Sequence, residues 1–81
     1  MNTRPLSTLQ VGERARVVRL CAGESMRRRL LDLGLVCGTE VRCLQRSPAG
    51  DPTAYLIRGA VIALRRRDSA CVMVREERSW G

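Results

Sequence analysis

The sequence predicts a mainly β fold, a small barrel or rolled-up sheet of about five strands with one short α-helix inserted after the first strand. Two observations predict it. Five short runs of alternating or β-branched apolar residues are separated by regular turns. Only one stretch, between the first two runs, has a helical apolar stripe and marked ends.

The five predicted strands follow one another at short intervals, and each is bounded by turn residues. The connection at 47–52 is the strongest turn, because it holds two prolines and a Gly-Asp pair. The alternation in the first strand is imperfect, so the sequence leaves its inward face open. The predicted strands are residues 14–21, 39–46, 53–58, 60–65 and 70–76.

The predicted helix has a signal at each end. Ser25 is placed to cap its start by accepting a hydrogen bond from a free backbone N–H. Gly34 ends it as a left-handed residue, which makes Leu33 the C-cap. Leu35 then contacts Leu30, as in a Schellman ending.

The helix has a core face and an outer face. At 100° per residue, Met26, Leu30 and Leu33 share one narrow stripe, which we assign to the core. The three arginines at 27–29 fan over about 200° and therefore form no single patch. Leu31 lies off the stripe, on the side of Arg27 and Arg28. It is either buried under a neighbouring loop or an exposed apolar anchor rimmed by arginine.

A chain of 81 residues predicts a single domain, 1–81, with a thin aliphatic core. We place the core at about 8–76, after a short lead at 1–7. A turn at 8–13 begins this core, and we expect 77–81 to be a frayed tail. No apolar signal segment or membrane span is seen, so the sequence favours a cytoplasmic protein whose cysteines stay reduced.

The charge predicts an anionic partner. Fifteen arginines, without lysine or histidine, give a net charge of +7. Nucleic acid, an acidic protein face and an anionic lipid surface all fit, as does a solvated basic surface with no dedicated role. The clusters at 27–29 and 65–67 suit phosphate contacts, but with only two aromatic residues the chain lacks a stacking platform. Specific nucleic-acid recognition is therefore disfavoured, whereas charge-driven binding stays open.

The side chains needed for catalysis or for a metal site are scarce. Without histidine or a nucleophile motif, the sequence predicts no enzyme, no cofactor and no small-molecule substrate. The four cysteines form no C-x-x-C pair, and Cys43 and Cys71 fit buried strand positions. Cys21 and Cys37 flank the helix and are weak metal candidates.

Three motifs are informative when read together. They are R-R-L-L-D-L-G-L at 28–35 followed by G-T-x-V at 38–41, P-x-G-D-P-x-x-Y-x-I-R-G at 48–59, and I-A-L-R-x-x-D-x-A at 62–70. In this order and spacing they resemble the FeoA family of small cytosolic proteins of bacterial ferrous iron uptake, from about residue 8 to residue 76. Cys37 departs from the family, which often has proline there, and the cysteines are not part of its pattern.

The resemblance implies an SH3-like β-barrel and partnership with FeoB, a membrane transporter with a cytosolic G-protein domain. FeoA-like domains also occur at the C-terminus of iron-dependent repressors of the DtxR type. Because the sequence shows no helix-turn-helix before the domain, we expect a transport accessory rather than a repressor. Fold likeness to SH3 domains does not by itself imply peptide binding.

The sequence and the resemblance together favour a non-enzymatic adaptor that docks on the cytosolic part of a FeoB-type transporter and modulates its assembly or GTPase cycle. We expect Leu31 and Leu35 as apolar contacts and Arg27, Arg28 and Arg65 as a charged rim. The arginines also suit the anionic inner leaflet, which would make the protein peripheral at the inner membrane. The alternatives are a small basic regulatory or nucleic-acid-binding module and a cysteine-based metal carrier or sensor.

Overall fold

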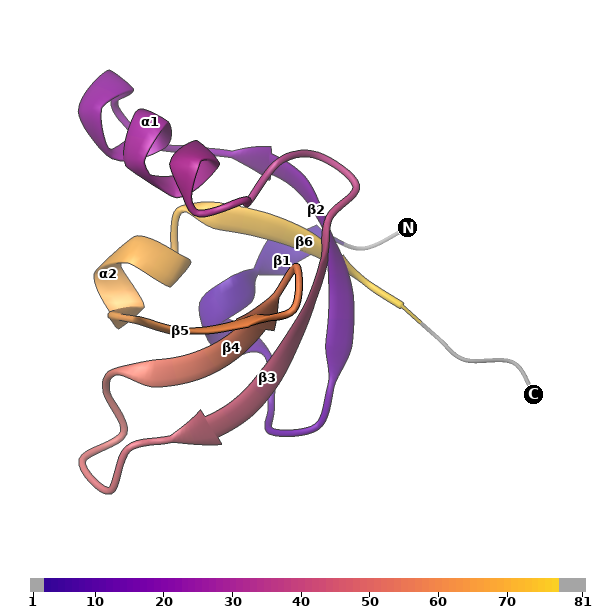
Figure 1. The fold of residues 1–81 in the computed structure, drawn as a ribbon, viewed down its shortest axis with the longest axis vertical. Helices are drawn as coiled ribbons and strands as arrows, with labels where there is room; N and C mark the ends of the chain where they lie inside the picture. Colours follow the sequence, from indigo (N-terminus) through magenta and orange to yellow (C-terminus); the bar gives the residue numbers. More distant parts are fainter. Residues whose placement is uncertain (1–2, 78–81) are drawn as a thin grey trace.

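The computed structural model describes residues 3–77 as one rolled antiparallel sheet of six strands with a helix above it (Figure 1). The predicted mainly β fold is confirmed. The strands pair in the order β1-β6-β2-β3-β4-β5, and the sheet is not closed, so β1 and β5 are its edges. The strands are β1 (Thr3–Pro5), β2 (Arg14–Leu20), β3 (Glu40–Arg46), β4 (Thr53–Ile57), β5 (Ala60–Leu64) and β6 (Val72–Glu76).

Helix α1 (Glu24–Asp32) lies between β2 and β3, as predicted, and stands at the top of the rolled sheet in Figure 1. Two shorter helical turns, which the sequence did not predict as helices, fill other connections. These are a 3-10 turn η1 (Leu6–Thr8) and a four-residue helix α2 (Arg66–Ser69).

The domain core begins earlier than predicted. Strand β1 pairs with β6, and Leu6 and Leu9 are completely buried, so the boundary near residue 8 was wrong. The buried Tyr55 hydroxyl donates a hydrogen bond to the Leu6 carbonyl at 3.5 Å. At the other end Glu77 is half-buried, and its backbone N–H donates to the Arg14 carbonyl. The rest of the predicted tail, 78–81, lies outside the described residues.

The irregular alternation in β2 has a structural cause. Ala15, Val17 and Leu20 are all buried, although strict alternation would turn Leu20 to the opposite face. The register with β6 shifts between Val17 and Arg19, which is a β-bulge. Because a bulge inserts one extra residue, Val17 and Leu20 both reach the core.

The predicted end of α1 is confirmed. The Leu35 N–H donates to the Leu30 carbonyl at 3.1 Å and the Gly34 N–H to the Leu31 carbonyl at 2.9 Å, the two bonds of a Schellman motif. Gly34 has φ +100°, and Leu30 and Leu35 are both buried. The ending therefore folds the chain back onto the core.

The predicted start of α1 was wrong by two residues. The N-cap is Gly23, no side chain caps it, and Ser25 lies inside the first turn. Glu24 also lies in that turn. Its carboxylate stabilises the positive, N-terminal end of the helix dipole. The start of the helix is therefore stabilised by a charge and not by a side-chain hydroxyl cap.

The end of α1 also contacts the hairpin of β4 and β5. The two turn residues, Arg58 (φ +52°) and Gly59 (φ +82°), both have positive φ, as a tight two-residue hairpin requires. A Cβ atom on Gly34 would lie 2.8 Å from Cδ of Arg58. The Arg58 side chain therefore lies over a position where only glycine fits.

Gly34→Ala should lower the free energy of unfolding by more than the roughly 1–2 kcal/mol that a left-handed alanine costs, because its Cβ also displaces Arg58. Gly12→Ala is the matched control. Gly12 also has a positive φ, +92°, but an added Cβ there would have no atom within 4 Å, so this variant measures the backbone cost alone. Urea denaturation measures both. In an Arg58→Ala background the excess cost of Gly34→Ala should vanish; an unchanged excess would contradict the contact.

Glu13 should make the fold less stable in acid. The Gln10 backbone N–H donates to its carboxylate at 2.7 Å and Arg4 at 3.1 Å, and these hydrogen bonds, that of Gln10 foremost, lower the Glu13 pKa below its ordinary 4.5. The unfolded chain therefore takes up this proton first, so stability falls as pH drops below about 4.5. Thermal unfolding from pH 3 to 7 should show a shallower acid slope for Glu13→Gln; an identical slope would exclude Glu13 as a source.

Candidate docking surface

The outer face of α1 carries three of the five predicted contact residues. Leu31 is 38% exposed, and with Arg27, Arg28, Glu24 and Asp32 it lines a shallow hollow of about 330 Å³. The sequence left open whether Leu31 is buried under a loop or exposed beside arginines, and in the structure it is exposed. An apolar side chain bordered by guanidinium and carboxylate groups is typical of a protein contact surface.

The other two predicted contact residues lie elsewhere. Leu35 is fully buried, because the Schellman ending turns its side chain inward against Leu30, so its assignment as a surface contact was wrong. Arg65 is exposed but forms the N-cap of α2, and it is not among the residues that line the α1 hollow.

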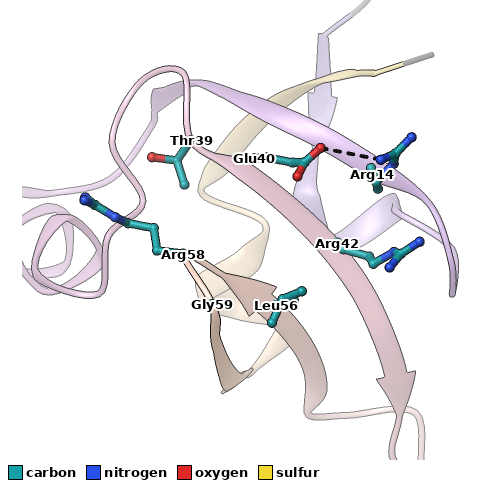
Figure 2. Close-up of a pocket in the computed structure, with 7 residues that line it drawn as sticks. All are labelled: Arg14, Thr39, Glu40, Arg42, Leu56, Arg58 and Gly59. Carbon is teal, nitrogen blue, oxygen red and sulfur yellow. Dashed lines mark ion pairs between the residues drawn. The ribbon is translucent and has the colours of Figure 1, made fainter. Parts of the chain in front are cut away.

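Sequence reasoning missed a second hollow, of about 360 Å³, on the outer face of β2, β3 and β4 (Figure 2). Strand register creates it. Arg14 lies directly opposite Arg42, and Arg42 directly opposite Leu56. The alternation of residues along each strand could have predicted that these side chains point outward. Only the register between β2 and β3 shows that the two arginines lie opposite each other. The lining residues are Arg14, Thr39, Glu40, Arg42, Leu56, Arg58 and Gly59.

This sheet hollow is basic. Like charges directly opposite each other destabilise a sheet, and here Glu40 partly offsets them, with its Oε2 3.9 Å from Nη1 of Arg14. Figure 2 shows Arg58 extending from the other side of the hollow toward the connection between α1 and β3. Three guanidinium groups and one carboxylate suit the binding of anionic groups such as carboxylates or phosphates.

The cysteines differ in accessibility. Cys21 and Cys37, the weak metal candidates, are both exposed. Cys43 is fully buried, and burial raises the pKa of its thiol. Cys71 is half-buried and its S–H donates to the Arg67 carbonyl at 3.4 Å. Among residues 3–77, no three His, Cys, Asp or Glu side chains come together in a way that could hold a metal ion.

No helix in residues 3–77 has both the length and the apolar character needed to cross a bilayer.

The similarity to known proteins decides the family. Residues 4–76 match the FeoA domain. The chain belongs to the FeoA family. It is 36% identical over 69 residues to an Fe(2+) transport protein A/Fe(2+) transporter FeoB fusion protein of Porphyromonas gingivalis. That match covers 85% of this chain but only 8% of the fusion protein, so the chain corresponds to a small part of its relative.

Solved structures share the fold over nearly the whole chain. The NMR structure of an FeoA-like protein from Clostridium acetobutylicum has a TM-score of 0.90 at 25% identity, covering 100% of this chain and 94% of that one. Stenotrophomonas maltophilia FeoA, described as a prokaryotic SH3 domain protein and crystallised with zinc, has a TM-score of 0.80 at 32% identity, covering 91% and 95%. A manganese-dependent transcriptional repressor shares only the fold, with a TM-score of 0.86 at 20% identity, covering 95% of this chain and 42% of the repressor.

This FeoA chain should show two classes of thiol. Cys21 and Cys37 should react quickly with a thiol reagent at neutral pH, because both are exposed. Cys43 should react only on unfolding, since it is buried and thiolate is the reactive form. Mass spectrometry of the labelled protein with and without urea measures this; rapid labelling of Cys43 in the native protein would contradict the buried position.

Proposed function

We propose that this protein is a non-enzymatic accessory of ferrous iron uptake that docks on the cytosolic part of a FeoB-type transporter and modulates its assembly or GTPase cycle. The observation that carries the proposal is the relative in which an Fe(2+) transport protein A region and a FeoB transporter form one chain. Fusion keeps two modules at high effective concentration. A docking surface on the FeoA domain would then keep it on the transporter.

The outer face of α1 suits that role. Leu31 is an apolar side chain exposed on a regular helix, where its position is fixed by packing of the opposite face. Arg27 and Arg28 border it and would steer an acidic surface toward it. We assign the binding energy mainly to Leu31, because central apolar anchors dominate interfaces while rim charges mostly change the association rate.

The basic surface also fits a position beside the membrane. A net charge of +7 would attract the anionic inner leaflet, at about 1 kcal/mol per basic residue near the surface. Docking on a transporter would bring the protein to that leaflet, so the two contacts would act together. Arg65, exposed on another element, is a candidate for this second, electrostatic role.

Leu31→Asp should weaken binding to the purified cytosolic domain of the cognate transporter at least about 30-fold, as expected for an interface anchor. Val11→Asp is the matched control. Val11 is 57% exposed and lies in the loop between η1 and β2, at the end of the molecule away from α1 in Figure 1. Calorimetry measures both. Equal affinities for the folded wild type and Leu31→Asp would exclude the α1 face.

A further inference from the structure

Strand β5 is an edge with open backbone groups. It pairs with β4 on one side and is last in the sheet order. Ile57 and Ala60 flank the two-residue turn and so form its hydrogen-bonded pair. Val61 and Ala63 then occupy the alternate positions, and their N–H and C=O groups point away from β4. Within residues 3–77, neither residue has a backbone partner outside the sheet.

This edge lacks the features that usually protect an edge strand. Its residues, Ala-Val-Ile-Ala-Leu, include no charge and no proline, and its register with β4 has no bulge. Val61 is 66% exposed, and Ala63 is exposed as well. The other edge, β1, has only three residues and ends in Pro5, so it is protected in two ways.

The charge around β5 selects the kind of partner. Arg58 precedes the strand, and three consecutive arginines at 65–67 follow it. The nearest acid after the strand, Asp68, is buried and lies 3.5 Å from Arg29 on α1. In space, the Asp51 carboxylate also lies at that end, where it accepts a hydrogen bond from the Arg66 N–H at 2.8 Å. Three arginines outnumber it, so both ends of the edge keep a net positive charge. A second copy pairing antiparallel with β5 would put Arg58 opposite arginines 65–67 of its partner, and this repulsion disfavours self-association.

We propose that β5 is a docking edge that takes an extended acidic segment of another protein as a seventh strand. The main-chain groups of Val61 and Ala63 would bind the segment backbone, and the positive charges of Arg58 and Arg65 would attract carboxylates at its two ends. The site is separate from the α1 face and needs no transporter. A failure of peptide binding at β5 would therefore leave the function proposed above unaffected, and the reverse also holds.

The test is an NMR titration of the whole chain with the peptide Asp-Glu-Val-Thr-Val-Thr-Glu-Asp, whose length matches the span from Arg58 to Arg65. The matched control is Asn-Gln-Val-Thr-Val-Thr-Gln-Asn. The acidic peptide should slow exchange of the Val61 and Ala63 amides and give strand-type contacts across the edge. Its dissociation constant should be at least about tenfold lower than that of the amide control at low salt.

Two variants of an exposed position sharpen the test. Val61→Glu should lose binding of the acidic peptide at least about tenfold through like-charge repulsion, whereas Val61→Lys should retain it. Ala63→Pro should also lose binding, because proline removes an outward N–H that the sheet does not use. Shifts spread over all basic surfaces without protection of Val61 and Ala63 would overturn the proposal. So would pairing of β5 with a second copy in the absence of peptide.

Discussion

The geometry at Gly34 determines how the helix and the sheet of this small domain fit together. A left-handed residue there closes the Schellman hydrogen bonds, and the chain turns so that Leu35 enters the core beside Leu30. The missing side chain also leaves room for Arg58, which lies over the same point from the hairpin of β4 and β5. A single residue thus ends α1, places a core leucine and fixes the helix against the sheet.

Local signals predicted the local features of the fold, and contacts between distant residues supplied the rest. The Leu30–Leu35 contact was predictable because a Schellman motif is encoded within six residues. The same motif implies that Leu35 is buried, so its assignment as a surface contact conflicted with the ending predicted for the helix. Strand β1 escaped prediction because three residues carry no measurable alternation, and only pairing with β6 makes them a strand. The sheet hollow depends on the register that sets Arg14 against Arg42, which no local pattern contains.

The net charge predicted an anionic partner but not its location, because the arginines serve different purposes. Arg4 pairs with Glu13 at 3.1 Å and Arg29 with the buried Asp68 at 3.5 Å, and both pairs join separate elements. These arginines contribute to the fold. Those at 27 and 28 border an exposed leucine instead, and those at 65–67 follow an open strand edge. Location in the fold, rather than charge alone, separates structural arginines from those available to a partner.

Arg58 connects the end of α1 to the start of the β5 edge. Its side chain lies against the end of α1, while its backbone forms the turn that begins β5. The positive φ of this non-glycine residue is an uncommon conformation, and here the tight turn and the contact with Gly34 both hold it. Because packing fixes the helix end to the start of the strand, the α1 face and the β5 edge keep a constant separation and orientation. The domain therefore presents two different candidate surfaces, one apolar and helical, the other an open strand, in a defined arrangement.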